Sequence, residues 1–214
     1  MDRLPRGRHG LSAEFVAQNQ RERLVAGLIQ ALYEVGYQKT TVSLIGQRAS
    51  VSKSDFYRHF ESKDDCFLVA YDAAVDRIRR CVGDACEASE GEAWAQRVGV
   101  AVDALLQLVT AEPALGSIAL VEGIRAGRGV YDRYQRALDS FVQDLRQGAP
   151  MSPAGTAVPE VTAEAVVGGV AALLGRRILA REPEQLPRLF PEILEFVLAA
   201  YFGAEEARRL VSAG

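Results

Sequence analysis

The sequence predicts an all-α protein of about nine helices, and two observations carry this prediction. Apolar residues recur every three or four positions, the spacing of one helix face, along most of the 214 residues. No segment shows the strict alternation of apolar and polar residues that is typical of a half-buried strand. With 49% hydrophobic and 25% charged residues, the chain has enough apolar content for an ample core, which excludes a disordered protein.

The N-terminal third is predicted to hold four helices, two of them short. The first surrounds leucines spaced four residues apart over 24–32 and stops at Gly36. Short helices follow over 42–49 and 53–59, each preceded by hydroxyl residues that can cap it. A longer helix runs from residue 63 to about 87, with acidic residues in its first turn, where the helix dipole favours them.

The rest of the chain is predicted to form further helices. Residues 147–159 carry no charge and three prolines, so we expect a surface loop there. The expected helices cover residues 92–110, 113–125, 128–147, 161–181 and 186–202.

Charge is distributed unevenly along the chain. Residues 1–63 carry ten Lys and Arg against six Asp and Glu, whereas residues 64–214 carry fifteen against twenty-two. All three lysines, Lys39, Lys53 and Lys63, lie in the first part. A basic N-terminal part on an acidic body indicates that the N-terminal end faces a polyanion.

Catalytic and metal-binding signatures are absent from the sequence, so an enzyme is not expected. None of the common nucleotide-binding, zinc-protease or nucleophilic-serine motifs occurs, and no histidine follows His59. The three cysteines, Cys66, Cys81 and Cys86, form no CxxC pair, which predicts neither a disulfide framework nor a metal site. We therefore expect no cofactor, and reduced cysteines in a cytoplasmic protein.

The sequence also gives no sign of export or of a membrane partner. The N-terminus is basic but has no apolar segment behind it, which excludes a secretory signal. The longest apolar uncharged run, Ala165–Gly175, is shorter than the roughly 18 residues that span a bilayer.

Residues Thr40–Lys63 have the spacing of a helix-turn-helix unit. Two short helices meet at a turn near residues 50–52, and a longer helix lies on either side. Gly46 is small, as a close crossing of the two helices requires, and Ser52 is expected to cap the second. That second helix is polar outside and has two phenylalanines inside, as expected for a helix that enters the major groove of DNA.

A spaced signature lies in the same stretch. It consists of Thr40-Thr41-Val42, Val51-Ser52-Lys53, Phe56-Tyr57-Arg58-His59-Phe60 and Ser62-Lys63. With these residues the chain resembles the TetR family of transcriptional regulators, over roughly residues 20–75. The resemblance implies a basic arm and helix lead-in over 1–18, a DNA-binding domain over 19–63, and an effector-binding and dimerisation domain over 64–214.

The resemblance also implies a set of DNA-binding residues. Hydroxyls and cations beside a helix N-terminus are typical phosphate partners, and the implied phosphate contacts are Thr41, Tyr57 and Lys63. Ser52, the expected cap of the second short helix, also belongs to the implied DNA-binding residues. Groove-facing or backbone contacts are implied for Ser43, Gln47, Lys53, Ser54 and His59.

The sequence departs from the family pattern at three positions. Ser50 stands where the turn usually has Gly, so a positive φ there has an energetic cost. Ser54 replaces a frequent Gly. Asp55 stands where Thr is common, and it either caps the helix locally, which we favour, or accepts from a cytosine amino group.

The N-terminal segment before the first helix is basic. It includes Arg6 and Arg8, and its glycines and proline oppose regular structure. The segment is either an arm that lies along DNA and reaches the minor groove, or a solvated tail.

Two sets of residues are assigned to the body, each with an alternative. The first either lines an effector cavity or belongs to the ordinary core: Tyr71, Trp94, Leu120, Tyr134 and Phe141. The second set either forms a dimer interface, as a four-helix bundle across a two-fold axis, or packs within one subunit as an internal hairpin; the dimer is favoured, because nearby helical glycines permit close approach. Its residues are Val166, Val170, Leu173, Leu174, Ile193, Phe196, Val197 and Ala200.

Together with these features, the resemblance implies a homodimeric, ligand-responsive transcription factor, most simply a repressor. It is expected to bind a palindromic double-stranded DNA operator and to be released by a small-molecule effector, which the apolar body hints is hydrophobic. The alternatives are an activator or a partner-controlled member of the same family, or a helical ligand-binding protein or enzyme without a DNA function.

Overall fold

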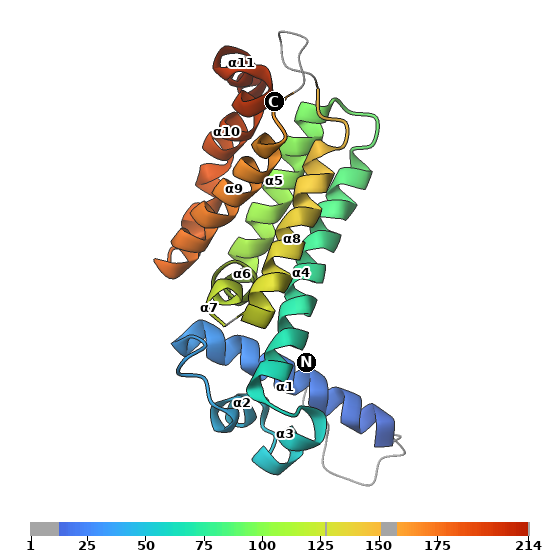
Figure 1. The fold of residues 1–214 in the computed structure, drawn as a ribbon, viewed down its shortest axis with the longest axis vertical. Helices are drawn as coiled ribbons and strands as arrows, with labels where there is room; N and C mark the ends of the chain where they lie inside the picture. Colours follow the sequence, from blue (N-terminus) through green and yellow to red (C-terminus); the bar gives the residue numbers. More distant parts are fainter. Residues whose placement is uncertain (1–12, 127, 151–157, 214) are drawn as a thin grey trace. The chain divides into compact units, whose positions relative to one another are not determined.

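The computed structural model describes residues 13–126, 128–150 and 158–213 (Figure 1). These residues form helices and no strand, which confirms the predicted all-α fold class. The chain divides into two compact units between Ala73 and Ala74. We call them the head unit and the body unit.

The head unit contains three helices and the beginning of a fourth. They are α1 (Ala13–Val35), α2 (Val42–Ala49), α3 (Lys53–His59) and α4 (Lys63–Ala88), which continues past the division between the units. Both short helices have the predicted bounds. The core of this unit consists of completely buried apolar side chains from each helix: Leu24, Leu28, Ile45, Phe56 and Phe67.

Two glycines allow close packing within the head unit. A Cβ on Gly27 of α1 would lie 2.9 Å from the Ala49 nitrogen and from the Ile45 oxygen, so α2 lies directly against α1 here. A Cβ on Gly46 would lie 2.6 Å from the carbonyl oxygen of Val51. The turn after α2 therefore requires a glycine at position 46. The sequence predicted a close crossing of two helices at Gly46, but the close crossing lies at Gly27, between α1 and α2.

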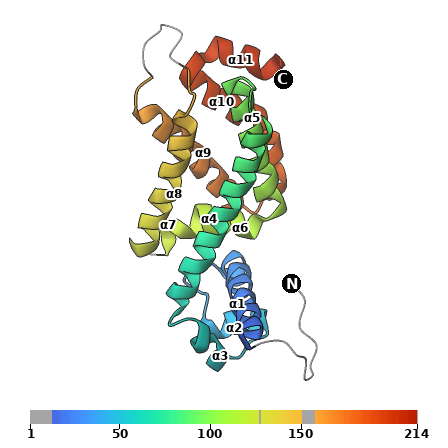
Figure 2. The ribbon, with the colours of Figure 1, turned by 90° about the vertical axis from the view of Figure 1, so that its right-hand side faces the viewer.

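The body unit is built from the rest of α4 and the helices that follow it. Figure 2 shows α10 beside α5, α9 and α11 in this unit, and these helices are in contact. The elements are α5 (Trp94–Ala111), α6 (Pro113–Ser117), η1 (Ile118–Glu122), α7 (Gly123–Arg125), α8 (Arg128–Arg146), α9 (Val161–Leu179), η2 (Pro183–Leu189), α10 (Phe190–Phe202) and α11 (Ala204–Ala213).

Three features of the body unit differ from the sequence prediction. The helix predicted over 113–125 is present, but its middle, η1, is π-helical. The helix predicted over 186–202 begins as a 3₁₀ turn, η2, and becomes α-helical only at Phe190. A further helix, α11, follows Gly203, whose φ of 81° ends α10.

The centre of the body unit is apolar and closely packed. Gly175 of α9 faces η1, since a Cβ there would lie 3.2 Å from the carbonyl oxygen of Leu120. Glu122 is an exception to the apolar composition, because it is a carboxylic acid with only 3% of its surface exposed. The completely buried residues of this core include Leu106, Val109, Leu174, Leu186 and Ala207.

Across the described ranges, no single helix is long and apolar enough to cross a membrane. By length and composition alone, residues 94–111 and 113–125 would together be long and apolar enough, but the second segment is bent by 107° relative to the first.

Candidate nucleic-acid interface

The turn between α2 and α3 is held in a left-handed conformation. Ser50 has a φ of 53° and a ψ of 45°, which confirms the positive φ expected from the sequence. The Val51 N–H donates to the Gly46 carbonyl at 2.9 Å and closes the end of α2. From α1, the Arg23 guanidinium donates to the carbonyl of Ser50 at 3.1 Å and to that of Ala49. The turn is therefore fixed both by its own backbone and by α1.

The N-terminus of α2 presents a row of exposed polar side chains. Thr41 caps the helix, because its hydroxyl oxygen accepts from the Leu44 N–H at 3.2 Å. Ser43 and Gln47 are exposed and lie one turn apart, so they share a face of α2.

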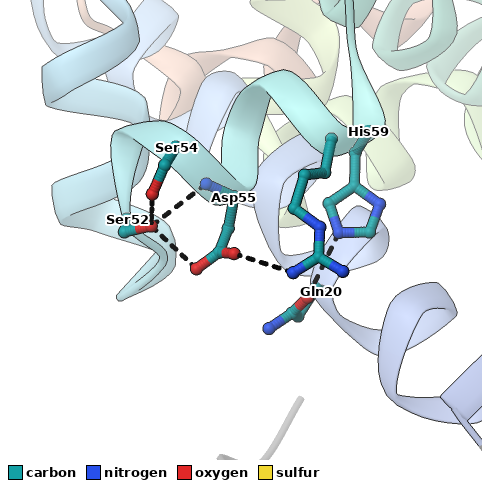
Figure 3. A network of polar contacts seen from close by, with 6 residues as sticks. Gln20, Ser52, Ser54, Asp55 and His59 are labelled. Atoms are coloured by element: carbon teal, nitrogen blue, oxygen red, sulfur yellow. Dashed lines mark hydrogen bonds and ion pairs between the residues drawn. The ribbon is translucent and has the colours of Figure 1, made fainter.

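The N-terminus of α3 is organised by a network around Ser52 (Figure 3). The Ser52 hydroxyl accepts from the Asp55 N–H at 3.0 Å and donates to the Asp55 carboxylate at 2.7 Å. Its proton is thereby used, so Ser54, 2.8 Å away, donates to the Ser52 oxygen. Arg58 lies 3.4 Å from the other carboxylate oxygen.

Asp55 therefore has a local role at the start of α3. Its carboxylate bonds the hydroxyl of the capping residue, rather than a backbone amide as expected from the sequence. The hydrogen bond from Ser52, followed by that from Arg58, lowers the pKa of Asp55. A carboxylate bound in this way stays charged, and its charge is partly balanced by Arg58.

The outer face of α3 carries groups suited to phosphates. Tyr57 is 53% exposed, and its ring packs nearly perpendicular to that of Phe56, which is completely buried. Lys53 is exposed in the first turn of the same helix. The predicted division of α3 into an apolar inner side and a polar outer side is confirmed.

Two of the predicted contacts are turned toward the head unit itself. The Nε2 atom of His59 lies 3.2 Å from the amide oxygen of Gln20 in α1 (Figure 3), so Nε2 carries the proton and donates. The ammonium group of Lys63 donates to the Tyr37 carbonyl at 2.9 Å and lies 3.9 Å from the centre of its ring. Arg6 and Arg8 lie outside the described residues.

Sequence reasoning missed several residues that hold this interface in place. Arg48 of α2 forms an ion pair with Glu34 of α1, with 2.6 Å between Nη2 and Oε2. The hydrogen bond from Arg48 lowers the pKa of Glu34. Arg23, Gln20 and Tyr37 make the contacts described above. Each is distant in sequence from its partner, and helical periodicity carries no signal for such pairs.

The five residues assigned to an effector cavity do not share one environment. Tyr71 and Tyr134 are buried, and the Tyr134 ring stacks on Tyr131 with 6.4 Å between centroids. Trp94 packs instead on Tyr201 of α10, at 4.7 Å, and on Phe202. Leu120 and Phe141 are half-buried. Trp94 thus belongs to the packing between α5 and the end of α10.

The residues assigned to a dimer interface fall into two groups. The first is buried in the subunit's own core, with at most 3% exposure, and has no surface to offer a partner: Val166, Leu174, Ile193 and Val197. Val170 and Leu173 are half-buried, whereas Phe196 is 50% exposed and Ala200 is exposed. A Cβ on Gly169 would lie 3.4 Å from the Phe196 ring, so this exposed ring lies on α9.

Among the residues that the structure describes, no group of three or more His, Cys, Asp or Glu side chains could hold a metal ion.

Comparison with known proteins gives matches to both the sequence and the fold. Residues 24–70 match the model of the family described as bacterial regulatory proteins, tetR family. An uncharacterized HTH-type transcriptional regulator of Mycobacterium tuberculosis (strain ATCC 25618 / H37Rv) is 26% identical over 155 residues, covering 70% of this chain and 78% of that protein.

Solved structures share the all-α architecture. The fatty acid degradation regulator FadR from Bacillus halodurans superposes with a TM-score of 0.70 at 15% identity, over 84% of this chain and 94% of that one. A TetR-like transcriptional regulator from Rhodococcus sp. RHA1 gives 0.68 at 17% identity, over 92% and 99%. FadR from Bacillus subtilis in complex with stearoyl-CoA also gives 0.68, at 15% identity, over 84% and 98%. By its helix-turn-helix sequence over residues 24–70 the chain is similar to the tetR family of bacterial regulatory proteins, and its fold is shared by solved structures of transcriptional regulators.

Proposed function

We propose that the protein is a ligand-responsive transcriptional repressor that binds a palindromic DNA operator as a homodimer and is released by a small-molecule effector. One observation carries the DNA-binding part of this proposal. Lys53, Ser54 and Tyr57 form an exposed polar face at the capped N-terminus of α3, and the opposite side of that helix is completely buried. Such a helix can enter the major groove without disturbing the core behind it.

The exposed residues of α2 and α3 are proposed as the contacts with DNA. Thr41 and Tyr57 would bind phosphates, and the other groove or backbone contacts would be Ser43, Gln47, Ser52, Lys53 and Ser54. His59 joins them through the ring nitrogen that is not bonded to Gln20. We also propose the Arg6 and Arg8 segment as an arm along the DNA backbone.

Dimerisation is proposed to use the part of α9 and α10 that one subunit leaves uncovered. This face contains Gly169, Phe196 and Ala200, which are exposed and apolar. A ring that is half exposed on a surface of small residues favours the close approach of a second copy. Two recognition helices about 34–36 Å apart would then reach successive major grooves.

A matched pair of substitutions tests the dimer. Phe196→Glu should produce monomers in sedimentation analysis, because a charge in an apolar interface is not compensated. Ile124→Glu introduces the same charge at a position of similar exposure, 52% against 50% for Phe196, and should leave the dimer intact. If both variants remained dimeric, the interface would lie elsewhere.

The effector is proposed to bind in the body unit. The structure of FadR from Bacillus subtilis, which shares this fold, contains stearoyl-CoA. The apolar core of the body unit supports an effector that is hydrophobic or amphipathic. To move the protein from 1:99 to 99:1 between its two states, such a ligand must prefer one state by about 5.5 kcal/mol.

Salt dependence tests the assignment of phosphate contacts. Lys53→Met should weaken binding to all duplexes alike and reduce the slope of log K against log salt by about 0.9. Tyr57→Phe should also weaken binding uniformly, but without changing the slope. Arg209→Met, an exposed cation on α11, is the control and should leave both quantities unchanged. A changed sequence preference in Lys53→Met would instead assign this residue to base contacts.

A further inference from the structure

The loop between α1 and α2 is closed by hydrogen bonds and leads directly into the helix-turn-helix. Gly36 has a φ of 76°, and the hydroxyl of Thr40, which is 2% exposed, donates to the Gly36 carbonyl at 2.8 Å. The Thr40 N–H is directed at the same carbonyl, at 3.2 Å. The next residue, Thr41, caps α2. A displacement of this loop would therefore displace the N-terminus of α2.

Tyr37 in this loop contacts the first two turns of α4 with three different groups. Its hydroxyl donates to the carboxylate of Asp64. Its carbonyl accepts from Lys63, whose ammonium also lies over the ring. The Tyr37 ring packs nearly perpendicular to the Phe67 ring, with 5.1 Å between centroids and 81° between planes. We call Tyr37, Lys63, Asp64 and Phe67 the Tyr37 clamp.

We propose that the Tyr37 clamp fixes the start of α2 to the first turns of α4, and that Lys63 acts in DNA binding as a positioning residue through Tyr37. This inference rests on the proposed function. It gives Lys63 a role different from the phosphate contact that its sequence position implies. The clamp couples any movement of the first turn of α4 to the DNA-binding helices.

The geometry favours positioning over phosphate binding for Lys63. The residue is half-buried, and its ammonium already has an oxygen acceptor at 2.9 Å and an aromatic face at 3.9 Å. Both contacts are favourable for a cation, and the Lys63 side chain would lose them if it turned toward a phosphate. Lys53 differs in each respect, because it is exposed on the outer face of α3.

The Tyr37 hydroxyl remains a donor over a wide pH range. Burial, and then the hydrogen bond to Asp64, raises the pKa of Tyr37 well above its usual value of about 10. The contact with Asp64 therefore persists under physiological conditions.

Lys63→Met in the full chain tests the proposal, with Lys53→Met as the matched control. In free protein, Lys63→Met should speed hydrogen exchange of the Ile45 amide, which donates to the Thr41 carbonyl at 3.0 Å, by about tenfold. It should weaken DNA binding by a similar factor and leave the salt slope unchanged. Lys53→Met should leave exchange unchanged and lower the slope by about 0.9.

Conservative variants separate the clamp from a general loss of structure. Lys63→Arg keeps a donor and a cation over the ring, and should restore both exchange and binding. Tyr37→Phe removes only the bond to Asp64, and should change exchange in the same direction as Lys63→Met but less. The proposal is overturned if Lys63→Met lowers the salt slope by about 0.9 while exchange at Ile45 is unchanged. If the unaltered protein bound no duplex, the proposed function would fail, whereas the exchange measurements would still decide whether the clamp exists.

Discussion

The head unit and the body unit are both helical, but different kinds of contact specify them. In the head unit, individual polar groups set the geometry: Thr41 and Ser52 cap helices, and Arg23 binds the turn. In the body unit, the helices are held by a broad apolar core to which many side chains contribute. A polar contact requires one residue type at one position, whereas an apolar contact accepts several.

This difference explains where the family resemblance resides. The family model matches residues 24–70, which lie wholly in the head unit. Solved structures share the fold over most of the chain at only 15 to 17% identity. The body unit can therefore change its sequence as long as the packing of its helices is kept.

Gly46→Ala should have the largest effect of the substitutions that compare the two units. The new methyl group would meet the Val51 carbonyl at 2.6 Å, and a backbone atom in a bonded turn cannot move aside. We expect a loss of about 2–3 kcal/mol in the stability of the head unit, read from hydrogen exchange in α2. Gly83→Ala, which would meet nothing within 4 Å, should instead stabilise α4 by about 0.5–1 kcal/mol.

Gly116→Ala should cost less, although its methyl group would be equally crowded. It would lie 2.6 Å from Cγ1 of Val109 and 3.0 Å from Cδ1 of Ile178, and both atoms end side chains that can shift. A loss of about 1 kcal/mol in the free energy of unfolding of the body unit is expected in denaturant titration. A loss larger than that of Gly46→Ala would contradict the contrast between a specified head unit and an adaptable body unit.

Ser50→Gly should stabilise the head unit. Glycine adopts the left-handed conformation of this turn without the steric cost that serine has, so a gain of about 1 kcal/mol is expected. Thermal unfolding followed by far-UV circular dichroism, with exchange in α2 to identify the unit, measures this. No gain would mean that the contacts of Arg23 with the turn depend on the serine.

Asp55→Asn should produce the smallest effect, and one that depends on pH. The folded-state pKa of Asp55 is lowered, so its charged form contributes stability above the unfolded value of about 4 and loses it as the pH falls below that value. The unaltered protein should therefore be more stable than the variant at pH 7, and the difference should decrease in acid titrations as the pH falls below the unfolded value. A difference that stayed constant with pH would mean that the Ser52 network does not depend on the carboxylate charge.

The sequence predicted the parts of the molecule that depend on local patterns. The bounds of α2 and α3, the positive φ of Ser50 and the inward side of α3 all follow from capping residues and helical spacing within a few residues. The π-helical turn in η1 does not follow from such local patterns, because one extra residue in a turn hardly changes the apolar spacing. In α9, apolar residues surround the helix, so spacing does not show which of them the subunit buries.

Contacts between distant residues account for the rest. Lys63 lies 26 residues from Tyr37, and Arg23 lies 27 residues from Ser50. Such pairs form only when helix crossings bring them together, and no period in the sequence encodes those crossings. The family resemblance therefore implied a phosphate contact for Lys63, and its position beside Tyr37 appeared only in the folded head unit.

Selection of bound duplexes from a random pool tests the central claim most directly. The purified full chain would be used at about 150 mM salt, where nonspecific attraction to phosphates is reduced, and the retained duplexes sequenced. We predict enrichment of a two-fold symmetric site whose half-sites are about one helical turn apart, 34–36 Å between recognition helices. If no sequence were enriched from protein shown by mass spectrometry to carry no small molecule, the account of this chain as a sequence-specific dimeric repressor would be contradicted.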